Sequence, residues 1–372
     1  MQKIISYFLL FFSLLLLFLV TTRSLNSSLR TYPPFSNTKQ TKAIATKKIS
    51  GSSYVKKQDI TLSSLNAKAC CLMDAATGRV LYGKQEDKKL PMASTTKIMT
   101  ALVVLEHLPL DTVVTVPKEA TLVEGSSIYL RENEKITVEE LLYGLLLESG
   151  NDAAHTLAVA VSGDIPSFAA LMNEKGAALG LVGTHFENPH GLSADGHYTT
   201  AYELARITAQ AMKNEFFRTA VATKKHIAPS LDGELTRYFF NHNKLLRLYE
   251  GAVGVKTGFT KAAGRCLVSA AEKDGSLFIA VTLDDGNDWN DHMAMLSYAG
   301  ESFDTVEIAA NGAFGVYAGG MRFSNPDDVY LTVPKGNKPV FRYEVTLSNG
   351  IGTVEYFDSD GTPLGKFSLQ KT

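Results

Sequence analysis

Cysteine is scarce in this chain of 372 residues, which has only Cys70, Cys71 and Cys266. Three thiols cannot form a disulfide framework, and the first two are neighbours in an apolar run, so we expect small buried side chains. The sequence also lacks C-x-x-C and H-E-x-x-H spacings, and its eight histidines are scattered. These absences argue against a metal site.

An excess of charge of one sign is lacking as well. The 37 Lys and Arg residues balance 38 Asp and Glu residues, for a formal net charge of −1. Nothing in this balance points to a nucleic-acid partner. A hydrophobic content of 45% with 20% charged residues is ordinary for a soluble globular protein. The length suits two domains, or one large domain with a small one.

Residues 1–23 are interpreted as a targeting segment. Lys3 precedes an apolar run from Ile4 to Val20, which is at the lower limit for spanning a bilayer. The sequence after Val20 is a poor cleavage site, whereas Arg23 argues against a stable anchor whose C-terminal side is outside. We favour a cleaved signal peptide, with an N-terminal anchor as the alternative. Either one predicts an extracytoplasmic protein, on the outer face of the cell membrane or secreted.

Residues 24–62 are rich in Ser, Thr and Lys and poor in apolar residues, which predicts a flexible basic linker. Such a segment is either a solvated tether or a means of association with an anionic membrane surface through the N-terminus. The C-terminus shows no amphipathic helix, so any membrane attachment is expected at the N-terminal end.

Residues 63–302 are predicted to form an α+β domain. Apolar strands occur at both ends of this region, and helical patterns occupy its middle, which favours one antiparallel sheet flanked by helices and closed by the first and last segments. Strands are expected at 69–73, 79–82, 253–256, 266–271 and 277–283, and helices at 94–107, 137–147, from 152 onward, 166–179 and 200–212.

Residues 303–372 differ in texture. Four segments alternate between apolar and polar residues with period two, and Asn349-Gly350 and Asp360-Gly361 are typical of hairpin turns. We expect a small C-terminal all-β domain without a catalytic set. The predicted strands are 329–333, 343–347, 353–357 and 366–369.

Three short motifs carry the candidate chemistry. Ser94 begins a predicted helix and Lys97 follows one turn later on the same face, where a desolvated lysine could accept the serine proton. Ser149 and Asn151 flank Gly150 in a turn between two buried helices, and we expect their side chains to be exposed there. Taken singly, the first motif is more often an ordinary capped helix start, and the second is more often an ordinary turn between helices, than part of a catalytic site.

The third motif is Lys256-Thr257-Gly258-Phe259, at the end of a predicted strand. Small residues before Lys256 indicate a backbone that comes close to another group. The order S-x-x-K, S-x-N, K-T-G is the one found in penicillin-binding proteins and class A β-lactamases.

From about Lys68 to Gly300 the chain resembles the serine-type D-alanyl-D-alanine carboxypeptidases, the low-molecular-mass penicillin-binding proteins, in a Firmicutes-like form. Ser149–Ala154, Asn188–Leu192 and Lys256–Thr260 carry the resemblance with the motif at Ser94. It implies a penicillin-binding-protein or β-lactamase-like transpeptidase fold and needs no cofactor.

The resemblance also implies roles for the motif residues. Ser94 would attack the bond between the two terminal D-alanines of a peptidoglycan stem peptide, and β-lactams would acylate it in the same way. Lys97 would take the proton, Ser149 would relay it to the leaving group, and Asn151 would orient Lys97 and bind the substrate amide. Lys256 and Thr257 would bind the terminal carboxylate, Gly258 belongs to the same strand edge, and the N–H groups of Ser94 and Phe259 would form the oxyanion hole.

Three other functions stay open at this point. A transpeptidase or endopeptidase would use the same acyl-enzyme, and an inactive peptidoglycan-binding scaffold would keep the fold alone. A class A-like β-lactamase would need a glutamate to activate water, for which Glu187 is the candidate. His190 and His197 are either structural loop residues or part of the site, and Arg265 is either a carboxylate ligand or a solvated side chain.

Overall fold

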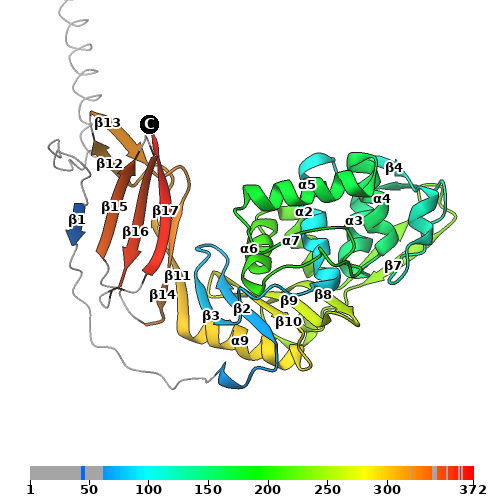
Figure 1. Ribbon diagram of the computed structural model, residues 1–372, viewed down its shortest axis with the longest axis horizontal. Coiled ribbons are helices and arrows are strands. Elements are labelled where there is room, and N and C mark those ends of the chain that lie inside the picture. The colour runs from blue at the N-terminus through cyan, green and yellow to red at the C-terminus, as the bar shows by residue number, and fades with distance from the viewer. Residues whose placement is uncertain are drawn as a thin grey trace, which may run out of the picture.

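The computed structural model describes residues 43–46, 62–318, 320–336, 342–348, 351–358, 361 and 363–372 (Figure 1). The predicted targeting segment lies outside these residues, as does most of the predicted linker. In the part of the chain that is described, no helix combines the length and the apolar character needed to span a membrane.

One stretch of the predicted linker differs from expectation. Ala43–Thr46 is strand β1, antiparallel to β15 (Arg342–Ser348), with Ala43 opposite Val345. The reason is tertiary, since β15 would otherwise be the edge of its sheet, and its backbone groups can pair with a strand of unremarkable sequence.

A five-stranded antiparallel sheet forms the centre of the larger part of the molecule, as predicted. Its order is β3-β2-β10-β9-β8, so the N-terminal hairpin joins strands from much later in the chain, and Cys71 lies opposite Val281. The strands are β2 (Ala69–Asp74), β3 (Val80–Lys84), β8 (Ala252–Thr260), β9 (Gly264–Lys273) and β10 (Ser276–Leu283). This arrangement confirms the α+β class.

The sheet is buried on both faces, which explains the continuous apolar run of β2. Cys71 and Met73 face one core, with the helices α2 to α7, whereas Cys70 and Leu72 face a second core. Helix α9 (Asp288–Ser302) supplies Met295, Leu296 and Ala299 to the second core. All three cysteines are free and buried, as predicted, and burial raises the pKa of Cys70 to about 12.

The predicted helices are present, and side chains cap the starts of three of them. Thr137 accepts from Glu140 N at 3.2 Å, Asp164 from Ser167 N and Thr200 from Glu203 N. The helices are α2 (Lys97–His107), α3 (Val138–Leu147), α4 (Asn151–Ser162), α5 (Ile165–Ala178), α6 (Ala201–Ala211) and α7 (Glu215–Ala222).

Several elements were not anticipated, because short or polar sequences give little periodic signal. Helix α9 is the longest of these, and its first turn is polar, so only part of it shows an apolar stripe. The others are η1 (Leu62–Ser64), η3 (Lys118–Leu122), β4 (Val113–Thr115), β5 (Lys135–Thr137), β6 (Lys225–Pro229), β7 (Thr236–Phe240) and α8 (Leu245–Leu248).

The C-terminal part is all-β and lies to one side of the helices (Figure 1). Its predicted strands are observed as β14 (Val329–Pro334), β15, β16 (Ile351–Phe357) and β17 (Pro363–Lys371), together with β11 (Phe303–Ala309), β12 (Gly315–Ala318) and β13 (Met321–Ser324). Helix α9 ends at Ser302 and β11 begins at Phe303. The domain boundary between residues 302 and 303 stays a prediction.

A buried carboxylate joins the two parts. Asp74, at the end of β2, accepts hydrogen bonds from Thr305 Oγ1 at 2.6 Å and Thr332 Oγ1 at 2.7 Å. Arg79 donates to Thr332 O from the other end of the same hairpin turn. The turn between the predicted strands 69–73 and 79–82 is therefore the point where β11 and β14 contact the sheet.

Candidate active site

Ser94 lies in a tight turn at the start of helix α2. The first residues, Ala93–Thr96, form the 3-10 turn η2, and the α-helix continues from Lys97, which confirms the predicted helix start. Ala93 has a φ of 47°, a left-handed conformation that is costly for a residue with a Cβ. Such strain just before the serine persists only because neighbouring groups hold the turn.

Lys97 is fully buried and connects the first two motifs. Its Nζ lies 3.1 Å from Ser94 Oγ and donates to Asn151 Oδ1 and His190 O at 2.7 Å each, which leaves the lone pair of a neutral amine for the serine hydroxyl. Burial lowers the pKa of Lys97 well below its usual value, the nearby charge of Lys256 lowers it too, and Asp152 opposes both. A neutral amine next to the serine hydroxyl is the arrangement that a general base requires.

The turn at Ser149 and Asn151 shows that one prediction was wrong. We expected both side chains to be exposed, but the residues are 5% and 4% exposed, respectively. The segment that begins at Glu124 covers the turn, since Asn151 Nδ2 donates to Glu124 O at 2.6 Å. Local sequence could not reveal this cover, because it comes from a segment 27 residues earlier in the chain.

Ser149 is held in a special backbone conformation, with a φ of 64°. The positive φ belongs to the serine, whereas the neighbouring Gly150 has a φ of −55°. The Ser149 hydroxyl is buried and has no hydrogen-bond partner among the described residues. A buried hydroxyl that is free to bond is costly without a role, which favours an interaction with a ligand.

The third motif lies on β8, the last strand of the sheet. Within the described ranges no strand pairs with the outer edge of β8, so that edge is available to an extended peptide. A Cβ placed on Gly258 would lie 3.1 Å from Ser94 N and 3.2 Å from Thr95 N. The strand therefore lies directly against the turn that carries the serine, and a glycine permits this contact.

Lys256 is buried like Lys97 but is bonded differently. It is 1% exposed, and its Nζ donates to Thr257 O at 3.0 Å. Burial lowers the pKa of Lys256 to about 7, although Glu148 opposes this shift. Phe259, by contrast, is 66% exposed, beyond the glycine.

His197 supports the serine turn, a role that sequence reasoning left open. Its Nδ1 accepts from Glu187 N at 3.0 Å, so Nε2 carries the proton and donates to Thr96 Oγ1 at 2.7 Å. Thr96 Oγ1 in turn donates to Ala93 O at 2.8 Å. Burial lowers the pKa of His197 to about 4, which agrees with a neutral ring.

The other doubtful residues take structural positions. His190 contributes its backbone carbonyl to Lys97, and burial lowers the pKa of its ring to about 3. Arg265 forms a bidentate pair with Asp288 and lies over the ring of Trp289. Glu187 is exposed and its carboxylate lies 3.4 Å from His185 Nδ1, so only its backbone N–H serves the site.

Comparisons with known sequences point to one family. A profile of the D-alanyl-D-alanine carboxypeptidase family matches residues 55–287. The D-alanyl-D-alanine carboxypeptidase DacF of Bacillus subtilis is 37% identical over 221 residues, which cover 58% of this chain and 56% of that protein. The alignment thus spans just over half the length of this relative.

Comparisons with solved structures agree with the predicted fold class. The Streptomyces K15 DD-transpeptidase has a TM-score of 0.60 and 37% identity, covering 63% of this chain and 97% of that one. The D-alanyl-D-alanine carboxypeptidase DacD from Francisella tularensis has a TM-score of 0.64 and 26% identity, covering 86% and 96%.

Proposed function

Since the chain belongs to the D-alanyl-D-alanine carboxypeptidase family, we propose that it removes the terminal D-alanine from peptidoglycan stem pentapeptides through an acyl-enzyme on Ser94. One observation carries the proposal. The buried Lys97 amine lies between Ser94 Oγ and Asn151 Oδ1, within hydrogen-bond distance of both. β-Lactams would acylate the same serine and trap it as a stable ester.

The acylation step follows from these contacts. Ser94 Oγ attacks the carbonyl carbon between the two D-alanines while its proton passes to Lys97 Nζ. The C–N bond then breaks, and the leaving D-alanine nitrogen receives a proton through the Ser149 hydroxyl. The N–H groups of Ser94 and Phe259 stabilise the oxyanion, since the contact of Gly258 with the serine turn brings the two segments together.

Substrate binding involves the strand side of the site. The extended peptide pairs with the free edge of β8, and its terminal carboxylate is bound by Lys256 and Thr257. Asn151 holds Lys97 through Oδ1 and contacts the substrate amide. In the second half of the reaction, water attacks the ester, Lys97 takes its proton, and Ser94 is released with a stem peptide one D-alanine shorter.

The test uses the full chain and intact-mass spectrometry. Incubation with penicillin should add the mass of one antibiotic molecule at Ser94, and incubation with a stem pentapeptide should release D-alanine. Ser94→Ala should show neither effect while its far-UV circular dichroism is unchanged. A wild-type protein that gives neither adduct nor D-alanine would refute the proposal and favour the scaffold.

A transpeptidase is the second candidate, favoured by the similarity to the Streptomyces K15 DD-transpeptidase. The same acyl-enzyme would then be attacked by an amine instead of water. Adding glycine as an acceptor at increasing concentration separates the two, because a carboxypeptidase continues to yield mainly the hydrolysed tetrapeptide. An endopeptidase would cleave a cross-linked dimer in the same assay.

A β-lactamase is disfavoured by the position of Glu187, which is exposed and paired with His185. The penicillin adduct should persist, and Glu187→Gln should leave its lifetime unchanged. Rapid hydrolysis of penicillin that this substitution abolishes would reverse the assignment.

The stem peptide is a cell-wall component, so an extracytoplasmic role follows from the family. We propose in addition that residues 1–23 direct export and that the N-terminal end associates with the outer face of the membrane. Cell fractionation and the N-terminal mass of the mature protein test this point. A soluble cytoplasmic protein that retains Met1 would contradict it.

A further inference from the structure

The segment from Glu124 to Glu134 holds Asn151 in place. Glu124 O accepts from Asn151 Nδ2 at 2.6 Å, and Ser126 O accepts from Asn151 N at 2.7 Å. Asn151 Oδ1 in turn accepts from Lys97 Nζ. The orientation of the amide, and through it the position of Lys97, therefore depends on where this segment lies.

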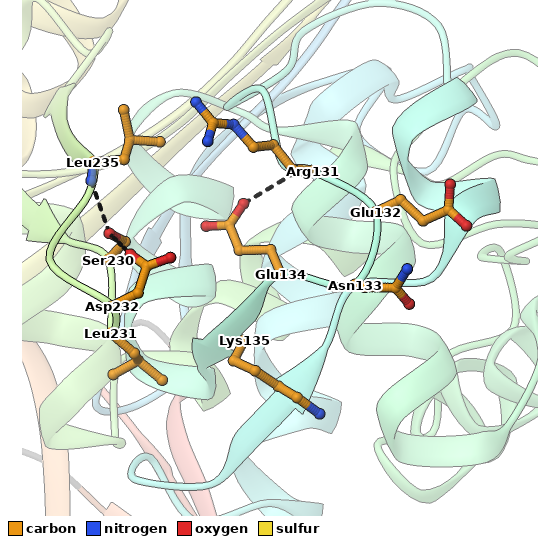
Figure 2. A pocket seen from close by; sticks show the side chains of 9 residues that line it. All are labelled: Arg131, Glu132, Asn133, Glu134, Lys135, Ser230, Leu231, Asp232 and Leu235. Atoms are coloured by element: carbon orange, nitrogen blue, oxygen red, sulfur yellow. Dashed lines mark hydrogen bonds between the residues drawn. The ribbon is translucent and has the colours of Figure 1, made fainter.

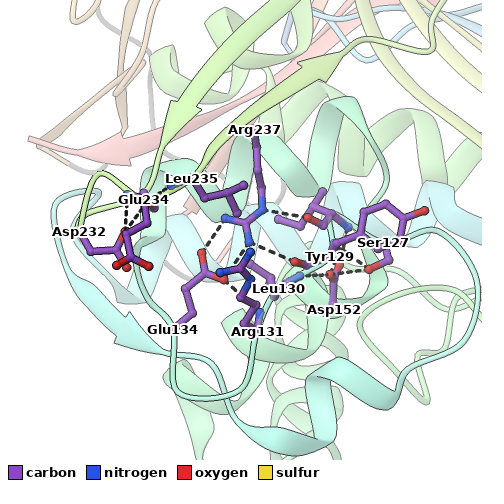
Figure 3. Close-up of polar contacts among 12 residues, drawn as sticks. Ser127, Tyr129, Leu130, Arg131, Glu134, Asp152, Asp232, Glu234, Leu235 and Arg237 are labelled. Carbon is purple, nitrogen blue, oxygen red and sulfur yellow. Dashed lines mark hydrogen bonds and ion pairs between the residues drawn. The ribbon is translucent and has the colours of Figure 1, made fainter.

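Asp152 fixes the segment from one side. This carboxylate is 2% exposed and accepts from Ser127 Oγ at 2.7 Å, and from Ile128 N and Leu130 N at 3.1 Å each. Figure 3 shows these contacts converging on Asp152. Because Asp152 follows Asn151 directly on α4, the carboxylate ties the segment to the helix that presents Asn151.

Arg237 fixes the same segment from the other side. Its Nε donates to Ile128 O at 2.9 Å and its Nη2 to Tyr129 O at 3.1 Å. The guanidinium also forms a bidentate pair with Glu134, with distances of 2.6 and 2.8 Å (Figure 3). Ile128 is thus bonded through its N–H to Asp152 and through its carbonyl to Arg237.

The segment needs such support because its backbone is strained. Tyr129 has a φ of 59° and Asn133 a φ of 64°, both in the left-handed region that favours glycine. A residue with a Cβ adopts this conformation at a cost, and it persists only where the surroundings impose it. Without the two charged groups, the segment would relax into other conformations.

We propose that Asp152 and Arg237 are positioning residues for the acylation of Ser94, acting through the segment 124–134 on Asn151 and thereby on Lys97. This inference rests on the proposed function. Neither residue touches the reacting atoms, so both act on the geometry of Asn151, and Asp152 acts in addition on Lys97 through its charge.

The two residues differ in one respect that makes them separable. Asp152 carries a negative charge that raises the pKa of Lys97, against burial and the charge of Lys256 on β8. The charge of Arg237 is instead balanced by its bidentate pair with Glu134. Loss of the Asp152 charge should therefore change the pH dependence of acylation, whereas loss of Arg237 should change the rate alone.

A cavity on the outer side of the segment supplies the control residue. It has a volume of about 440 Å³, and its lining includes Arg131, Glu134 and Leu235 but no residue of the three motifs (Figure 2). Arg131 bonds to Glu134 through its backbone N, while its side chain is exposed. Arg131→Gln thus removes an arginine from the same segment without removing a bond to Ile128 or Tyr129.

The experiment measures acylation of the full-length chain by penicillin as a function of antibiotic concentration. It yields a limiting rate constant and an apparent affinity, corrected for the active fraction by titration of Ser94. We expect Arg237→Gln to lower the limiting rate about tenfold, because it removes charge-assisted hydrogen bonds that act on the reacting groups only indirectly. Arg237→Lys should recover part of it, and Arg131→Gln should stay within about twofold, as expected of a surface change.

Asp152→Asn should lower the limiting rate by a similar factor and shift the acid limb of the profile to lower pH. Thermal melting followed by circular dichroism establishes whether each variant is folded. If Asp152→Asn does not fold, Arg237→Lys alone tests the positioning role. Wild-type rates in folded Arg237→Gln and Arg237→Lys would overturn the inference. A wild-type chain that is not acylated would instead refute the proposed function.

Discussion

The helix side and the strand side of the site hold their lysines in different ways. Lys97, on the helix side, contacts Ser94 Oγ, Asn151 Oδ1 and His190 O, whereas Lys256, on the strand side, donates to the carbonyl of its own neighbour. Both are buried, and burial lowers the pKa of both. From this difference we expect the helix side to be assembled before substrate arrives, and the strand side to be completed by an anionic group of the substrate.

The strongest test of this comparison is Lys97→Met, which keeps the volume of the side chain and removes the amine. Acylation by penicillin should fall at least about 100-fold, the usual contribution of a general base. The apparent affinity should change little, because Lys97 belongs to the preassembled side. Rapid-mixing or mass-spectrometric time courses measure both quantities. An acylation rate near that of the wild type would assign the base to another group.

Lys256→Gln addresses the strand side and should have a smaller effect of a different kind. A charge-assisted hydrogen bond contributes about 1.5–3 kcal/mol, so KM for a stem peptide should rise about tenfold to a hundredfold. The matched control is Lys261→Gln, which removes an exposed lysine close by on the chain. If Lys256→Gln lowered kcat alone, Lys256 would belong with the helix side.

The pH dependence of KM sharpens the same distinction. Lys256 has a pKa of about 7 and is charged below that pH, so binding of the substrate carboxylate should weaken as pH rises through 7. KM should rise about tenfold per pH unit, because the charged fraction falls by that factor, until it reaches the value of Lys256→Gln. Lys256→Arg, which stays charged, should give a flat KM over the same range. A rise in KM that persists in Lys256→Arg would trace the effect to another group.

Thr96→Val should have the smallest effect of the four. It removes the hydroxyl that connects His197 to Ala93 O and keeps the shape of the side chain. The loss of about 0.5–1.5 kcal/mol per hydrogen bond predicts acylation slower by a factor of about 2–10. Thr121→Val, on the exposed η3, serves as the control for a threonine with a local backbone bond. Equal effects of Thr96→Val and Thr121→Val would mean that the hydrogen bonds of Thr96 do not stabilise the serine turn.

Much of the fold was predictable from the sequence, since long periodic segments carry their own signal. Helices predicted to start at Thr137 and Thr200 are confirmed, and both threonines cap their helices, whereas the side chains of the glutamates three residues later bond elsewhere. Glu140 pairs with His226, and Glu203 accepts from Gly183 N. Helix α9 was missed because its first turn is polar, with Asp288 and Asp291, and shows no apolar stripe.

The site was predictable to a lesser degree. The motifs locate Ser94, Lys97 and Asn151, which the structure joins by hydrogen bonds, and their catalytic roles stay predictions. The burial of Ser149 and Asn151 was predicted wrongly, and the support from His197 was left open. Both depend on contacts between residues far apart in the chain, for which a single sequence has no signal.

The sequence by itself determined the chemistry at hand, because a serine and a lysine one helical turn apart must face the same direction. It also determined the central sheet, whose apolar strands cannot remain in water. Only the tertiary structure decided how acidic and basic those groups are. Their pKa values depend on burial and on charges brought close by other segments, and these are properties of packing that no local pattern encodes.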